Sequence, residues 1–174
     1  DPVVVHALLD GRDTMPRSGL GYMQELVTYA GNRPQIASLG GRYYGMDRDR
    51  RWDRTELWYR CAVQGIGPSV TDPLRTIREA YERGETDEFI RPVVVADASG
   101  PIAPMRDGDE VICFNFRSDR MRQIVRALTE VPFEGFPVDG RPRIGVTPMT
   151  VYDARYSLPA AFPPQSMARI MAQG

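Results

Sequence analysis

The chain has 174 residues, of which 42% are hydrophobic and 26% are charged, which is typical of one globular domain with a buried core. A formal net charge of −1 and an isoelectric point near 5.9 argue against a broad nucleic-acid or membrane surface, which would need a basic excess. All 22 basic residues are arginines, so their placement along the chain is more informative than their number.

The first predicted element is a strand over residues 2–9, PVVVHALL, because a short continuous apolar run is typical of a strand buried on both faces. It leads into a polar turn, residues 10–14, at the strand's carboxyl end. Ligands of open α/β sheets bind at that edge. His6 lies inside the strand, and we interpret it as a core histidine.

A helix is predicted next, with Ser18 as its N-cap and Gly31 at its end. A second strand, residues 35–39, delivers the chain into residues 40–54, GGRYYGMDRDRRWDR. This stretch interleaves arginines and aspartates with large rings. Such a mixture favours an anion site, because guanidinium forks bind oxyanions in a bidentate manner and bulky neighbours hold the forks in place. The alternative is a charged surface loop that leads into a helix.

The rest of the chain alternates between helices and strands. Helices are predicted from Trp52 and from Asp72-Pro73, which has the cap and the first-turn proline of a helix start. The predicted strands cover residues 92–96, 102–105 (antiparallel), 110–116 and 143–150. Between the last two, Arg117 and Arg120 flank the start of a helix, where free N–H groups already favour an anion. This order predicts a three-layer α/β/α sandwich with a mainly parallel or mixed sheet.

Four segments in the same order resemble one family: HALLDGRDT, GGRYYGMDRDRRWDR, TDEFIRP and FNFRSDR. They are similar to the 2,3-bisphosphoglycerate-independent phosphoglycerate mutases, whose two α/β domains are a phosphatase-like one and an inserted phosphotransferase domain. The chain resembles the insert. The resemblance assigns residues 1–160 to this substrate-binding domain and residues 161–174 to a hinge that leads toward the absent phosphatase-like domain.

The resemblance also implies a function, the interconversion of 3-phosphoglycerate and 2-phosphoglycerate in glycolysis and gluconeogenesis. The domain would hold the glycerate while the phosphate passes to and from a serine of the absent domain. The aspartate that matches Asp13 would contact the glycerate hydroxyls and help to move their protons. The implied substrate-binding residues are Arg12, Asp13, Arg42, Arg48, Arg117 and Arg120.

No metal ligand or cofactor is expected in this chain, and two manganese ions are expected in the absent domain. That domain would also carry the serine, so the isolated chain is predicted to be inactive. A cytoplasmic monomer is expected, with no nucleic-acid or membrane partner. Two alternatives remain at this point: an arginine-rich module that binds RNA or an acidic protein, and a metal-dependent phosphoesterase with Asp47 and Asp49 as ligands.

Overall fold

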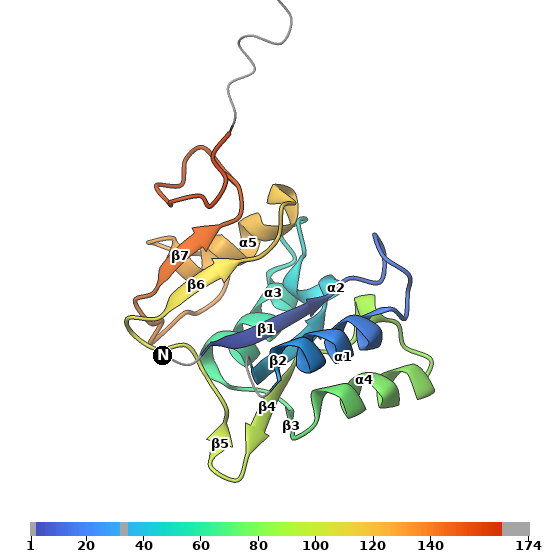
Figure 1. Ribbon diagram of the computed structural model, residues 1–174. Coiled ribbons are helices and arrows are strands. Elements are labelled where there is room, and N and C mark those ends of the chain that lie inside the picture. The colour runs from blue at the N-terminus through green and yellow to red at the C-terminus, as the bar shows by residue number, and fades with distance from the viewer. Residues whose placement is uncertain (1–2, 32–34, 165–174) are drawn as a thin grey trace, which may run out of the picture.

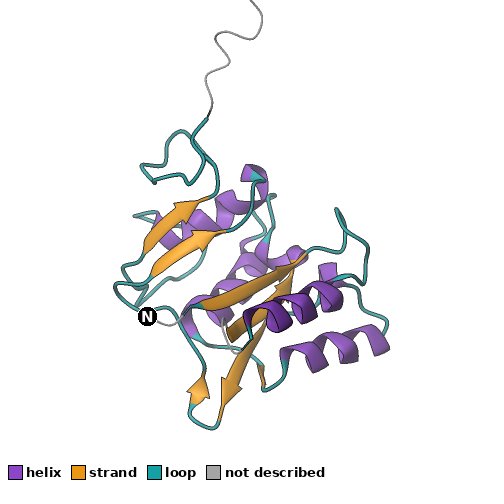
Figure 2. Cartoon of the chain, viewed as in Figure 1, coloured by secondary structure: helices purple, strands orange, loops and turns teal. Residues whose placement is uncertain are grey.

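The computed structural model describes residues 3–31 and 35–164, in which helices and strands alternate along the chain (Figures 1 and 2). In chain order these are β1 (Val4–Leu9), α1 (Gly19–Ala30), β2 (Gln35–Gly41), α2 (Arg42–Gly45), α3 (Trp52–Tyr59), the π-helical turn η1 (Arg60–Gln64), β3 (Ser69–Val70), α4 (Pro73–Glu82), the 3-10 turn η2 (Asp87–Phe89), β4 (Val93–Asp97), β5 (Gly100–Pro101), β6 (Glu110–Cys113), α5 (Ser118–Thr129) and β7 (Gly145–Pro148). None of the helices in these two ranges is long and apolar enough to cross a membrane.

The main sheet has the strand order β1-β2-β4-β3, and β5 pairs with β4. β1 runs parallel to β2 and β3 parallel to β4, whereas β4 is antiparallel to both β2 and β5. β6 and β7 pair in parallel as a second, two-stranded sheet. The predicted α/β class, with helices flanking a mixed sheet, is confirmed, although β6 and β7 pair with each other and not with the main sheet.

Two apolar cores show why the main sheet lies between helices. Ala7 and Leu9 of β1 pack with α1 and α4, while Leu8 packs against the core around Trp58 and Val125 of α3 and α5. Neighbouring residues of a strand point to opposite faces, so β1 contributes to both cores. Figure 1 shows α1 and α4 side by side.

The helix starts were predicted with mixed success. The carboxylate of Asp72 caps α4 by accepting the Arg75 N–H at 3.0 Å, as its position before a proline indicates. Ser18 precedes α1 but its hydroxyl donates to the Met15 carbonyl, so it does not cap the helix. The buried carboxylate of Asp87 caps it instead, accepting the Gly19 N–H at 2.7 Å. A cap 68 residues away in sequence leaves no local signal.

Two further expectations concern strands. The antiparallel strand predicted at residues 102–105 was wrong in position: β5 ends at Pro101, and Ile102 adds one hydrogen bond to the carbonyl of Val95. His6 is a structural residue, as interpreted from the sequence, with Nδ1 2.9 Å from the Ser38 hydroxyl on β2. Burial lowers the pKa of His6 to about 4, so the ring is neutral at physiological pH.

After β7 the described residues 149–164 form no helix or strand, but they are hydrogen-bonded to the segment just before them. The N–H groups of Ala161 and Phe162 donate to the carbonyls of Pro148 and Met149, both at 2.9 Å. The Phe162 ring lies 5.8 Å from that of Phe116. The predicted hinge at residues 161–174 therefore begins on a segment tied to β7, and most of it lies outside the described residues.

Candidate functional site

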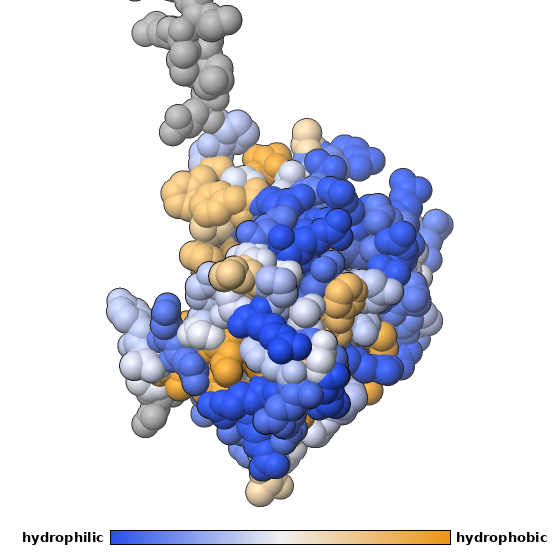
Figure 3. All heavy atoms as spheres, turned by 90° about the vertical axis from the view of Figure 1, so that its right-hand side faces the viewer, coloured by the Kyte–Doolittle hydropathy of each residue, from blue (hydrophilic) through white to orange (hydrophobic). Residues whose placement is uncertain are grey.

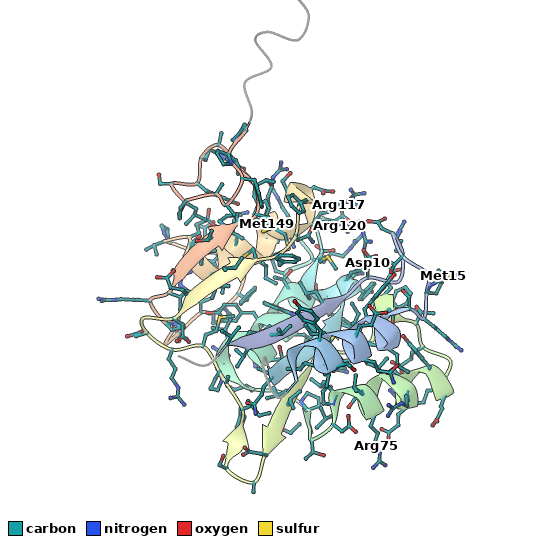
Figure 4. The ribbon with its side chains drawn as sticks, in the orientation of Figure 1. Asp10, Met15, Arg75, Arg117, Arg120 and Met149 are labelled. Atoms are coloured by element: carbon teal, nitrogen blue, oxygen red, sulfur yellow. The ribbon has the colours of Figure 1, made fainter. Side chains whose placement is uncertain are left out.

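Three polar segments meet at one edge of the molecule. They follow the carboxyl ends of β1, β2 and β6 and contain Asp10, Arg42 and Arg117 respectively. Figure 4 shows Asp10, Arg117 and Arg120 near one another at that edge, and the side of the molecule that Figure 3 presents is largely hydrophilic. We call Asp10, Asp13, Arg42, Arg48, Arg117, Asp119 and Arg120 the arginine cluster.

Arg42 lies at the centre of the cluster and is only 2% exposed. Its Nη1 donates to Asp10 at 2.5 Å and lies 3.0 Å from Asp13 Oδ2. The preceding Gly41 has to be a glycine, because a Cβ there would lie 2.2 Å from the Glu88 carbonyl oxygen. The close approach of β2 to η2 thus fixes the point from which the Arg42 side chain leaves the backbone.

Asp10 organises the loop that carries the site. Besides the Arg42 guanidinium, its Oδ1 accepts the backbone N–H groups of Arg12 and Asp13 at 3.0 and 2.9 Å. Burial opposes the charge of Asp10, but these hydrogen bonds outweigh it and lower the pKa. The pKa of Asp13 is lowered as well, first by the hydrogen bond from Arg42. Both side chains are therefore carboxylates at neutral pH.

The remaining contacts join two more arginines to the same chain of charges. Arg117 pairs with Asp13 on one side and with Asp119 on the other, where its Nη2 lies 3.2 Å from Oδ2. Arg48 Nη1 donates to the same Asp119 oxygen at 2.8 Å. Hydrogen bonds, above all from Arg117, lower the pKa of Asp119 to about 2. Acidic and basic groups thus alternate from Asp10 to Arg48.

Arg120 differs from the other arginines of the cluster. Its Nη1 donates to the Met46 carbonyl at 3.0 Å, and within residues 3–31 and 35–164 it forms no ion pair, while its buried Nε has no hydrogen-bond partner. Burial lowers the pKa of Arg120, and the positive charges of Arg42, Arg48 and Arg117 lower it further. An oxyanion at this position would relieve both the repulsion and the missing hydrogen bond.

Arg12 is the predicted site residue that the structure does not bring into this chain of contacts. Its side chain is 65% exposed and its Nη1 lies 3.6 Å from Glu88. Asp10 and Asp119 were missed by the sequence reasoning, which followed the arginines. The local signal is weak: the segments DGRD and RSDR place Asp10 and Asp119 within two residues of an arginine, but Arg42 and Arg48, which pair with them, lie in another segment.

Asp47 and Asp49, the ligands of the phosphoesterase alternative, are engaged inside the protein. Asp47 is buried, and its Oδ2 accepts from the N–H groups of Asp49 and Arg51 and from the Gln123 amide, each at 3.0 Å. Asp49 pairs with Arg51. Asp47 therefore attaches its loop to α5, and the part of the chain that the structure describes gathers no three groups that could hold a metal ion. The phosphoesterase alternative therefore receives no support from these contacts.

Comparisons with known proteins agree with the resemblance in the sequence. The family model described as BPG-independent PGAM N-terminus matches residues 1–154. The 2,3-bisphosphoglycerate-independent phosphoglycerate mutase 1 of Methanosarcina barkeri is 43% identical over 98% of this chain and 34% of its own length. The corresponding mutase of Nitratidesulfovibrio vulgaris is 46% identical over 95% of this chain and 33% of its own.

A solved structure agrees with these relatives. The phosphoglycerate mutase of Leishmania mexicana, crystallised at low cobalt concentration, matches 97% of this chain with a TM-score of 0.88 and 31% identity, over 33% of its own length. The chain thus spans about one third of the length of the proteins it matches. The alternative of a module for RNA or an acidic protein receives no support from these relatives. The chain therefore belongs to the BPG-independent phosphoglycerate mutase family, of which it matches the N-terminal part.

Proposed function

We propose that this chain is the substrate-binding phosphotransferase part of a phosphoglycerate mutase that interconverts 3-phosphoglycerate and 2-phosphoglycerate, a step of glycolysis and gluconeogenesis. The observation that carries the proposal is the arginine cluster, in which four guanidinium groups from two separate segments lie together and Arg120 has no carboxylate partner among the described residues. Phosphoglycerate carries a phosphate and a carboxylate, and guanidinium forks match both.

The proposed substrate-binding residues are Arg42, Arg48, Arg117 and Arg120 of the cluster, together with Arg12 at its margin. In the structure, the guanidinium groups of Arg42, Arg48 and Arg117 pair with aspartates of the chain itself. At Arg42 and Arg117, binding is therefore an exchange in which substrate oxyanions replace the carboxylate of Asp13. Such an exchange gives moderate affinity, which suits a site that must retain the glycerate while its phosphate leaves and returns.

Asp13 is the proposed catalytic residue, acting on the glycerate hydroxyls. Paired with Arg42 and Arg117 it is a weak base, because both guanidinium groups stabilise its charge. When substrate oxyanions take over these arginines, that stabilisation weakens and the pKa of Asp13 rises toward its ordinary value. The carboxylate then becomes a better acceptor for a hydroxyl proton, so binding itself prepares the base.

The phosphate acceptor and the metals belong to other parts of the parent protein in this proposal. A serine there accepts the phosphate, and two manganese ions there supply Lewis-acid chemistry. The described residues of this chain do not fit such ions, because they gather no three ligating side chains, and no step assigned to this chain requires a metal. Residues 1–160 form the proposed domain and 161–174 the proposed hinge to a phosphatase-like domain of the same chain, in a cytoplasmic monomer.

The test is a mutase assay on the purified full-length parent, supplied with manganese and 3-phosphoglycerate. We expect 2-phosphoglycerate from the parent and no turnover from the 174-residue chain alone. A parent that produces no 2-phosphoglycerate would overturn the proposed function. Turnover by the isolated chain that survives chelation would show that the serine and metal chemistry had been assigned to the wrong part.

Arg48→Lys in the same parent tests the binding role. A lysine keeps the charge but cannot form the planar fork, so we expect kcat/KM to fall about tenfold. Arg60→Lys is the matched control, because Arg60 is a half-exposed arginine that pairs with Glu56 at 2.6 Å outside the cluster. Equal kinetics for the two variants would show that Arg48 does not bind substrate.

A further inference from the structure

Asp119 holds together two arginines that come from different segments. Its Oδ2 accepts from Arg48 Nη1 at 2.8 Å, and the two carboxylate oxygens face Arg117 Nε and Nη2 at 3.3 and 3.2 Å. Arg48 lies between α2 and α3, whereas Arg117 immediately precedes α5. Without a shared anion these two guanidinium groups would repel each other.

The position of Asp119 in the helix does not account for these contacts. An acidic residue in the first turn of a helix is favourable wherever its side chain points, because the helix dipole acts on the whole first turn. Asp53 occupies the same kind of position in α3 and forms no ion pair among the described residues. Asp119 instead uses both of its oxygens on guanidinium groups of the proposed substrate site.

We propose that Asp119 is a positioning residue, which holds the guanidinium groups of Arg48 and Arg117 side by side so that both can address the same substrate oxyanion. This inference rests on the proposed function. The benefit is preorganisation: long arginine side chains that are already fixed lose less conformational freedom when the ligand binds. Asp119 itself does not touch the substrate, since its oxygens are directed at the two arginines.

This role and a purely electrostatic one predict opposite effects of removing the charge. If Asp119 acts only as a negative charge near the site, Asp119→Asn strengthens the local positive potential and should tighten the binding of an anionic substrate. If Asp119 positions the forks, the same substitution releases two mutually repelling guanidinium groups and should weaken binding. The sign of the change in affinity therefore decides between the two roles.

The experiment uses the full-length parent, whose wild-type turnover of 3-phosphoglycerate first tests the proposed function by itself. In Asp119→Asn we expect KM to rise about tenfold while kcat changes less than about threefold. Asp119→Glu, which keeps the carboxylate, should recover part of the loss. Asp53→Asn is the matched control and should leave both constants unchanged, because it removes a first-turn charge that forms no ion pair in the described chain.

A double-mutant cycle with Arg48→Ala removes the remaining ambiguity. Once Arg48 has been truncated, Asp119 has one arginine less to hold, so Asp119→Asn should cost less than half as much in KM as it does in the parent. Additive effects would overturn the proposal, and so would an unchanged or lowered KM in Asp119→Asn. Thermal unfolding of each variant identifies a general loss of structure. Such a loss would lower kcat and would not be confined to the affinity for substrate.

Discussion

Replacement of Arg42 by alanine tests whether the arginine cluster is built as the contacts indicate. The substitution removes the buried guanidinium that donates to Asp10 at 2.5 Å and lies 3.0 Å from Asp13. Asp10 loses a charge-assisted hydrogen bond, and contacts of this kind contribute about 1.5–3 kcal/mol each. For a domain of 174 residues this corresponds to a fall in Tm of about 3–12 °C.

The assay is thermal unfolding of the purified chain, followed by circular dichroism near neutral pH. Arg75→Ala is the matched control, because Arg75 also pairs with a carboxylate, at 2.7 Å from Glu79, but is 74% exposed on α4. Figure 4 shows it far from the cluster. Exposed pairs within a helix contribute little, so we expect a change below about 2 °C.

The pH dependence of the same variant gives an independent check. The pKa values of Asp10 and Asp13 are lowered in the folded chain, so their contribution to stability is present above the ordinary value of 3.8 and is lost as the pH falls below it. Arg42→Ala should therefore lose less stability than the wild type on acidification below about pH 4. An Arg42→Ala chain that unfolds with the wild-type Tm and acid sensitivity would refute the pairing.

Two further predictions concern the scaffold beneath the site. Folding lowers the pKa of His6 from 6.5 to about 4, so between these two pH values the unfolded chain binds more protons than the folded chain. The free energy of unfolding should therefore decline by up to about 1.4 kcal/mol per pH unit below pH 6.5. Urea unfolding of His6→Asn should show a much weaker dependence on pH, and an unchanged slope would contradict the lowered pKa of His6. Gly41→Ala should destabilise the chain by about 1–3 kcal/mol, because its Cβ would lie 2.2 Å from the Glu88 carbonyl oxygen. Gly21→Ala on α1 is the control and should be neutral or stabilising, because no atom lies within 4 Å of its Cβ. Equal Tm values for the two variants would contradict the close approach of β2 to η2.

The sequence was informative wherever the signal was local. Apolar runs located β1, β2, β4 and β6, and the pair Asp72-Pro73 marked the start of α4. The motifs placed Arg42, Arg117 and Arg120 at strand ends that meet in the fold. For the segments after β1 and β2 this follows from the parallel pairing, since the carboxyl ends of both strands lie at one edge of the main sheet. The segment after β6 reaches the same place from the second sheet.

What escaped prediction depends on contacts between distant residues. The cap of α1 comes from Asp87, which is distant in sequence. The pairing of β6 with β7, and not with the main sheet, depends on contacts that no local pattern records. Asp10 and Asp119 were overlooked because each looks like an ordinary turn or first-turn acid until its arginine partners arrive from another segment. Arg12 shows another limit of the motif, which does not give the direction of a side chain: here the guanidinium lies 3.6 Å from Glu88, at the margin of the cluster.

The balance of charge within the cluster connects its stability with the proposed binding. Three aspartates face four arginines, so the pairs compensate one another and one positive charge remains, at Arg120. With fewer aspartates the guanidinium groups would repel one another and destabilise this part of the fold. With a fourth aspartate paired to Arg120, no guanidinium would be left for a substrate oxyanion. Because a substrate with a phosphate and a carboxylate brings more negative charge than this single excess, some carboxylates must yield their arginines on binding. Asp13, which is 47% exposed and lies between Arg42 and Arg117, can yield most readily, and it is also the group proposed to act on the hydroxyls.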